Sequence, residues 1–318
     1  CLVMKNRKAF ITGIKSVSLS QKEKFFLKRY KPWGVILFSR NLKNFNQIKL
    51  LTNTIRSVFK DKKYPILIDQ EGGRINRLNK LIETSILTAK HFGNLYKFNK
   101  NKFYNYYKVY IVQTSYLLNE LGININTVPV LDVRRFKSNK IIGDRSYSSK
   151  AKNVSKIGDF CIQEFANGKI GTVIKHIPGH GLAKVDSHNL TPIVKKKIKY
   201  LYKNDFVPFK NKKTFFAMTA HVIYKDIDPI NTATHSPKII KLIRKKIGFK
   251  NIIISDDISM KGLKYSIKQN LNRALSAGCN LILHCNANYS EMRTVAENSP
   301  IVDNFIIQKT SQFYKFLS

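Results

Sequence analysis

The chain has 318 residues, of which 57 are Lys or Arg and 19 are Asp or Glu, so its formal net charge is +38. Its 43% hydrophobic and 11% aromatic residues exclude a disordered chain, which combines charge with few apolar residues. Apolar runs such as 35–38 and 252–254 are far shorter than the ~20 residues that span a bilayer, so we predict a soluble protein without a membrane span.

Short apolar or β-branched runs alternate with longer amphipathic stretches along the whole chain. We predict eight strands, at 9–13, 34–38, 66–69, 124–131, 171–175, 215–219, 251–255 and 281–285. Strands that alternate with helices form βα units and a parallel sheet. Eight such units favour the α/β fold of the (β/α)8 TIM barrel, which typically takes ~250 residues. We expect one domain over residues 1–318.

A doubly wound dinucleotide-binding sheet is the main alternative fold. It requires the string G-x-G-x-x-G after the first strand, where glycines let the backbone approach a pyrophosphate. The nearest string begins Gly179-His180-Gly181, but Lys184 stands where the third glycine is needed. The sequence contains no P-loop either, and the barrel remains the better prediction.

The four cysteines, Cys1, Cys161, Cys279 and Cys285, form no CxxC pair. Their spacing indicates neither a disulfide scaffold nor a zinc site, and it suits a reducing compartment such as the cytoplasm. The chain opens without the charged and apolar segments of a secretion signal. Because a strand is already predicted at residue 9, we expect the true start at Met4.

A net charge of +38 raises the alternative of a nucleic-acid-binding protein, since basic surfaces bind phosphate. The lysines, however, are spread along the chain at 22/24/28, 60/62/63, 195–199 and 245/246, on segments with helical apolar spacing. No nucleic-acid-binding motif accompanies them. We therefore interpret the charge as solvated helix faces and expect no nucleic-acid partner.

Polar residues gather where the predicted strands end, and this end of a TIM barrel carries the active site. Four of these strand ends read DQEGGR at 69–74 with Arg77 beyond it, KHIPGHG at 175–181 with DSH at 186–188, TAH at 219–221, and SDD at 255–257. The sequence therefore predicts a polar active site at the carboxyl ends of the strands.

Two adjacent acids, Asp256 and Asp257, end the seventh predicted strand. A carboxylate in this place either caps the following helix or acts as a nucleophile or electrostatic partner of a developing cation. We expect one of the two to react and the other to support it. The residues alone do not choose between them.

Four titratable residues, His176, His180, Asp186 and His188, follow the fifth predicted strand. One interpretation is a metal site, because His and Asp are common ligands. The other is a dyad, because side chains two residues apart in an extended loop project to the same side, and the Asp186 carboxylate can then orient the His188 imidazole. Such a histidine exchanges protons near neutral pH.

Three cations stand out from the basic background by their positions. Arg77 follows the third strand, Arg145 lies in the string IGDRSY at 142–147, and Lys175 ends an otherwise apolar strand beside His176. Cations in these places suit a substrate with hydroxyl groups, an amide carbonyl or a carboxylate.

Five strings together resemble the β-N-acetylhexosaminidases of glycoside hydrolase family 3. They are IDQEGGR at 68–74, IGDRSY at 142–147, KHIPGHGLAKVDSH at 175–188, MTAHV at 218–222 and SDDISM at 255–260. The likeness is strongest to the short, single-domain bacterial β-N-acetylglucosaminidases of peptidoglycan recycling. It extends in matching order from about residue 9 to residue 286.

This resemblance implies a retaining exo-β-N-acetylglucosaminidase that removes terminal non-reducing GlcNAc from GlcNAc-anhydro-MurNAc muropeptides. It implies Asp256 as the nucleophile of a covalent glycosyl-enzyme, and His188 as the acid/base paired with Asp186. The family's contacts to the N-acetylglucosamine match Asp69, Arg77, Arg145, Lys175 and His176. It implies no metal and no organic cofactor. We expect a cytoplasmic monomer whose partner is its carbohydrate substrate.

Three alternatives stay open beside this enzyme. A metal-dependent barrel hydrolase would use the His/Asp loop at 176–188. A phosphate-using β-N-acetylglucosaminidase would transfer the sugar to phosphate instead of water. A non-enzymatic basic protein on a degenerate barrel would bind polyanions in a salt-sensitive way, without turnover.

Overall fold

A computed structural model describes residues 4–135, 141–187 and 190–318. Eight parallel strands close into a barrel in the order β1-β10-β9-β7-β5-β4-β3-β2. They are β1 (Lys8–Gly13), β2 (Pro32–Leu37), β3 (Ile66–Ile68), β4 (Ile125–Asn126), β5 (Gly171–Ile177), β7 (Phe216–Thr219), β9 (Ile252–Asp257) and β10 (Leu281–His284). Each overlaps one of the eight predicted runs, so the predicted (β/α)8 barrel is confirmed.

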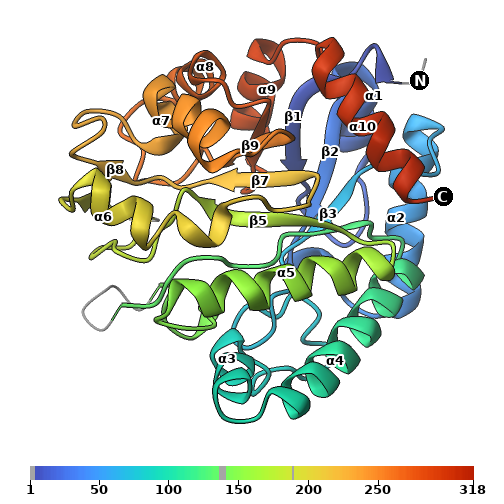
Figure 1. Ribbon diagram of the computed structural model, residues 1–318. Helices are drawn as coiled ribbons and strands as arrows, with labels where there is room; N and C mark the ends of the chain where they lie inside the picture. Colours follow the sequence, from blue (N-terminus) through green and yellow to red (C-terminus); the bar gives the residue numbers. More distant parts are fainter. Residues whose placement is uncertain (1–3, 136–140, 188–189) are drawn as a thin grey trace.

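Helices surround this barrel (Figure 1). They are α1 (Gln21–Tyr30), α2 (Phe45–Phe59), α3 (Ala89–Phe98), α4 (Lys100–Glu120), α5 (Ala151–Asn167), α6 (Ile198–Lys203), α7 (Pro237–Leu242), α8 (Ile267–Ala277), α9 (Tyr289–Asn298) and α10 (Asn304–Phe316). Two short strands, β6 (Ile193–Val194) and β8 (Ile223–Tyr224), form a small separate sheet that we did not predict. In the ranges that the structure covers, none of the helices has the length and apolarity needed to cross a membrane.

Helix α1 shows how the basic residues are arranged. Ser20 and Glu23 form a capping box at its start, in which the Ser20 side chain accepts from the Glu23 N–H. The helix buries Phe26 against the barrel and leaves Lys22 and Lys28 exposed. This agrees with the interpretation of the lysines as solvated helix faces. Two predicted groups differ, because residues 60–63 follow the end of α2 and residues 195–197 precede the start of α6, and neither stretch is helical.

The barrel interior is filled by alternate strand residues, and its N-terminal end is closed by α10. Trp33 and Phe216, near the starts of β2 and β7, pack edge to face with ring centroids 5.5 Å apart. Phe313 of α10 lies 5.2 Å from Phe216, and the Trp33 Nε1–H donates to Thr310 Oγ1 of the same helix at 2.9 Å. The open end of the barrel is therefore the carboxyl end of its strands.

The fourth strand is shorter than predicted. We predicted 124–131, but only Ile125–Asn126 forms a regular ladder. Pro129 has no N–H to donate, so it interrupts the pairing. Pairing with β5 resumes beyond it, because Lys175 N donates to Pro129 O at 3.2 Å and Leu131 N donates to Lys175 O at 2.8 Å. This return places Asp132 beside the end of β5.

Candidate active site

A cavity of about 180 Å³ lies at the open end of the barrel. Residues at the ends of β2, β3, β5, β7, β9 and β10 form most of its wall. Six of the eight predicted site residues line it: Asp69, Arg77, Arg145, Lys175, His176 and Asp256. Asp186 is half-buried in the loop after β5 and is not part of this wall. His188 lies outside the residues that the structure describes.

Strand alternation explains why these side chains reach the cavity. Successive residues of a strand face opposite sides, so every second residue of a barrel strand points inward. Leu67, Val173 and Ile254 belong to the cluster that fills the barrel interior. Two residues beyond each of them stand Asp69, Lys175 and Asp256, and all three line the cavity. The site thus continues the inward-facing series of β3, β5 and β9 past the apolar layers.

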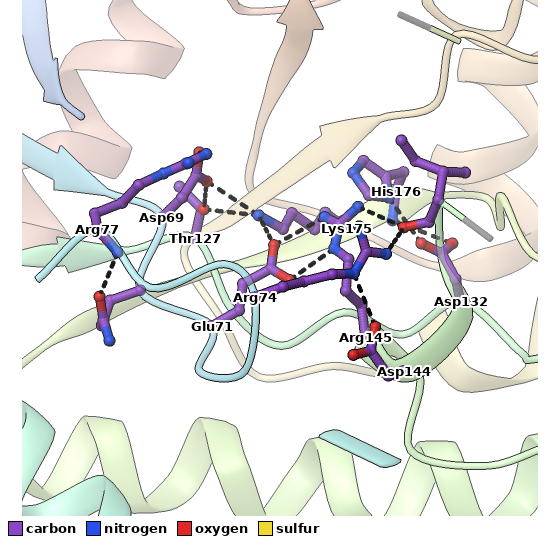
Figure 2. Close-up of polar contacts among 12 residues, drawn as sticks. Asp69, Glu71, Arg74, Arg77, Thr127, Asp132, Asp144, Arg145, Lys175 and His176 are labelled. Atoms are coloured by element: carbon purple, nitrogen blue, oxygen red, sulfur yellow. Dashed lines mark hydrogen bonds and ion pairs between the residues drawn. The ribbon is translucent and has the colours of Figure 1, made fainter. Parts of the chain in front are cut away.

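A chain of alternating charges crosses one side of the cavity (Figure 2). Arg77 Nη2 lies 3.4 Å from Asp69 Oδ2, and Lys175 Nζ lies 3.0 Å from Asp69 Oδ1. Lys175 Nζ also lies 2.7 Å from Glu71 Oε1. Arg145 closes the chain with two parallel hydrogen bonds to Glu71, each 2.8 Å long. A bidentate arginine–carboxylate pair of this kind is directional as well as strong.

Burial and these neighbours set the charge states of the chain. Burial alone would raise the pKa of Asp69, but the charges of Lys175 and Arg77 hold it well below its usual range. Burial likewise opposes ionisation of Glu71, yet Arg145 and Lys175 lower its pKa to about 2. The pKa of Lys175 is raised, because its two carboxylate neighbours outweigh the effect of burial. Asp69, Glu71 and Lys175 are therefore charged near neutral pH.

His176 is held by a buried carboxylate. Its Nδ1 lies 2.7 Å from Oδ2 of Asp132, which is fully buried. Burial would raise the pKa of Asp132, but His176 keeps it low. The same carboxylate accepts from the His180 backbone N–H at 2.6 Å. Asp132 thus fixes the ring of His176 and leaves Nε2 as the nitrogen that can meet a ligand.

The two acids that end β9 both line the cavity, but their surroundings differ. Asp257 Oδ1 accepts from the Ser259 N–H at 3.0 Å and from the Cys285 N–H at 3.3 Å, and Ser259 Oγ lies 2.8 Å from both carboxylate oxygens. Its carboxylate therefore holds the turn after β9. Asp256 Oδ1 accepts from the Asp257 N–H at 2.8 Å, and Asp256 continues the inward-facing series of β9 after Ile252 and Ile254.

Two other histidines are held by hydrogen bonds to neighbouring residues of the fold. His221 Nδ1 lies 2.7 Å from Thr234 Oγ1 and its Nε2 lies 3.0 Å from the Asp257 carbonyl oxygen. His284 Nε2 pairs with Glu291 at 2.9 Å. In the described ranges, no three His, Cys, Asp or Glu side chains are grouped so that they could hold a metal ion. The metal alternative also included His188, which falls outside those ranges.

Two residues that organise the cavity were not predicted from the sequence. Glu71 pairs with Lys175 and Arg145, and Asp132 pairs with His176. Glu71 stood in the string DQEGGR without an assigned role, and Asp132 follows the fourth predicted strand. For Glu71 a usable signal was present, because Lys175 ends an otherwise apolar strand and a buried cation requires an acid nearby.

The arrangement can bind a small polyhydroxylated ligand and act on it. Fixed cations and anions along one wall offer donors and acceptors at short intervals. Asp256, from another strand, places a carboxylate in the same cavity. Such a group can attack an electrophilic carbon or stabilise a cation.

Comparison with known proteins gives a consistent result. The glycosyl hydrolase family 3 N terminal domain matches residues 9–311. A β-hexosaminidase of Haemophilus ducreyi is 33% identical over 287 residues, which cover 87% of this chain and 80% of that protein. One of Haemophilus influenzae is 31% identical over 304 residues, with 93% and 84% covered. The crystal structure of NagZ from Neisseria gonorrhoeae in complex with N-trifluoroacetyl-D-glucosamine superposes with a TM-score of 0.87 at 26% identity, covering 98% of this chain and 90% of that one.

Proposed function

The chain belongs to glycoside hydrolase family 3, and we propose that it is a retaining exo-β-N-acetylglucosaminidase. The two relatives described above, at 33% and 31% identity, are named β-hexosaminidases, and a solved relative is in complex with an N-acylated glucosamine. The observation that carries the proposal is Asp256, a carboxylate in the inward-facing series of β9 that lines one cavity with the charged wall.

The charged wall is proposed to hold the sugar ring. Asp69 and Arg77 lie at the outer end of the chain of charges and are more exposed than Lys175, so a sugar hydroxyl can reach them. Hydroxyl groups donate to a carboxylate and accept from a cation, and hydrogen bonds to charged groups contribute about 1.5–3 kcal/mol. Lys175, Arg145 and His176 complete the proposed contacts of the ring.

The first chemical step forms a glycosyl ester. A carboxylate oxygen of Asp256 attacks the anomeric carbon while the bond from that carbon to the leaving oxygen breaks. His188 gives its proton to the leaving oxygen, and Asp186 stabilises the imidazolium before transfer. Family 3 resemblance supports these roles of His188 and Asp186.

The second step releases the sugar. Neutral His188 takes a proton from a water molecule, whose oxygen attacks the anomeric carbon and breaks the ester bond to Asp256. Two inversions at one carbon keep the configuration of the substrate. No step uses a metal ion or an organic cofactor.

We propose peptidoglycan fragments, GlcNAc-anhydro-MurNAc muropeptides, as the natural substrate. These fragments carry carboxylates, and a net charge of +38 would attract them from solution. We place the reaction in the cytoplasm and assign it to a monomer. In the described part of the chain the three cysteines are free thiols, which suits a reducing compartment.

The test is hydrolysis of an aryl β-N-acetylglucosaminide by Asp256→Asn and by His188→Ala. We expect both variants to keep the melting temperature of the parent and to lose about 10³-fold or more in kcat. The sugar first released by the parent should be the β anomer by NMR. Full activity in either variant, or initial release of the α anomer, would overturn the proposal.

A further inference from the structure

We propose that His180 is a positioning residue for the proposed acid/base step, because it holds Ser187, which stands between Asp186 and His188 in the sequence, through a hydrogen bond. The inference rests on the proposed acid/base role of His188 and adds a residue to it. Its basis is the geometry of His180 and Ser187, both of which the structure describes.

His180 joins the loop after β5 to the string that follows it. Its ring Nε2 lies 3.1 Å from Ser187 Oγ, and both side chains are buried, with exposed fractions of 2% and 4%. Its backbone N–H donates to Asp132 Oδ1, so the carboxylate that fixes His176 also fixes the base of this loop. One buried carboxylate thus anchors the cavity wall and the residue that holds Ser187.

The ring of His180 is suited to hold another residue and unsuited to donate a proton to substrate. Burial, together with the neighbouring His176 ring, lowers the pKa of His180 to about 4. Near neutral pH the ring is therefore neutral and accepts from or donates to the serine hydroxyl without change of charge. The hydrogen bond to Ser187 persists across the pH range in which a general acid of pKa near 7 works.

Ser187 is held from the opposite side by the turn after β9. Gly262 N donates to Ser187 O at 3.1 Å, and Thr191 Oγ1 donates to Gly262 O. A Cβ at position 262 would lie 2.1 Å from Ser187 O, so only glycine allows this approach. The turn at Gly262 follows the strand that carries Asp256. Ser187 therefore links the proposed acid/base string to the strand of the proposed nucleophile.

The rate of glycoside cleavage should depend on the hydrogen bond between His180 and Ser187 mainly when the leaving group must receive a proton. A misplacement of about 1 Å costs up to ~10²-fold in rate, and general acid catalysis contributes ~10²–10⁴-fold. Cleavage of a glycoside whose leaving group needs no proton, such as 2,4-dinitrophenolate, is insensitive to misplacement of the general acid and to its loss. A purely structural role would slow the cleavage of every substrate to the same degree.

The experiment compares kcat/KM of Ser187→Ala for methyl and for 2,4-dinitrophenyl β-N-acetylglucosaminide, because kcat/KM reports the step that expels the leaving group. We expect a loss of about 10–100-fold for the methyl glycoside and less than about 3-fold for the dinitrophenyl glycoside. Ser187→Thr, which keeps the hydroxyl, is the matched control and should recover most of the loss. Equal loss on both substrates, or no loss on either, would overturn the inference.

Two further variants complete the design. His180→Ala and the double variant with Ser187→Ala form a cycle in which the two losses should not add, because both remove one hydrogen bond. Additive losses would contradict the link, and Ser187→Ala alone still decides if His180→Ala does not fold. His188→Ala separates the acid/base role of His188 from the positioning role of His180. If His188→Ala loses kcat/KM equally on both glycosides, the acid/base assignment fails. If His188→Ala loses more on the methyl glycoside but Ser187→Ala does not, only the role of His180 is refuted.

Discussion

Glu71 is the residue whose removal tests the charged wall most sharply. It lies between Lys175 and Arg145, with a side chain only 6% exposed. Glu71→Gln keeps the shape of the side chain and removes its charge. In the chain of charges, Lys175 then keeps Asp69 as its partner, and Arg145 loses the carboxylate with which it is paired. Breaking a buried ion pair from one side is strongly destabilising.

The size of the effect follows from the pKa of Glu71. A fall from its ordinary value of 4.5 to about 2 is roughly 2.5 units, or about 3 kcal/mol of stability at 1.36 kcal/mol per unit. Because the folded-state pKa is lowered, this stabilisation is complete above the unfolded-state value and is lost as the pH falls from 4.5 towards 2. At pH 3 about 1 kcal/mol should remain.

Urea unfolding of the parent and of Glu71→Gln at pH 7, 5, 4 and 3 measures this difference. The matched control is Glu120→Gln, whose partner Lys49 lies 3.4 Å away on an exposed surface, where a pair contributes about 0–1 kcal/mol. A difference for Glu71→Gln below 1 kcal/mol at pH 7, or one that stays constant down to pH 3, would refute the reasoning.

Three other outcomes follow from the site. Asp257→Asn should lower the melting temperature by loosening the turn at Ser259 while retaining much more kcat than Asp256→Asn; the reverse order of kcat values would exchange their roles. Arg77→Met should raise KM for an aryl β-N-acetylglucosaminide about 10-fold or more through loss of a charged hydrogen bond, as steady-state kinetics would show, and an unchanged KM would remove Arg77 from the sugar site. Treatment with a chelator should leave kcat unchanged, and free N-acetylglucosamine should remain the product in phosphate buffer; activity restored only by zinc, or formation of a sugar 1-phosphate, would favour one of the alternative enzymes.

The strands of the barrel could be predicted because each is a buried apolar run between helical segments. The fourth prediction was too long, since Pro129 interrupts a ladder that the apolar pattern alone suggests is continuous. The small β6 and β8 sheet was missed, because strands of two residues carry no measurable alternation.

Within the site, residues at strand ends were predictable and pairings between distant strands were not. Alternation from Ile252 and Ile254 places Asp256, and not Asp257, in the inward-facing series of β9, and the local string SDD did not show this difference. Glu71 and Arg145 are 74 positions apart in the chain, and only the closed barrel brings them together. The role of Asp132 likewise depends on the return of the chain to β5 after Pro129.

The link between Ser187 and Gly262 has the same origin. Neither residue belongs to a pattern of apolar spacing, and their contact arises because the loops after β5 and β9 meet at one end of the barrel. Loops at this end of a TIM barrel build the active site from different strands. A residue that positions another is therefore found from structure more readily than from sequence.

The most direct test of the proposed function is to trap the glycosyl ester. A 5-fluoro N-acetylglucosaminyl fluoride slows both steps, because fluorine beside the ring oxygen disfavours an oxocarbenium-like transition state, while its fluoride leaves without a proton. Mass spectrometry of the peptide spanning 251–261 should then locate the sugar on Asp256. A sugar on Asp257 or on another peptide, or turnover without any covalent adduct, would contradict Asp256 as the nucleophile.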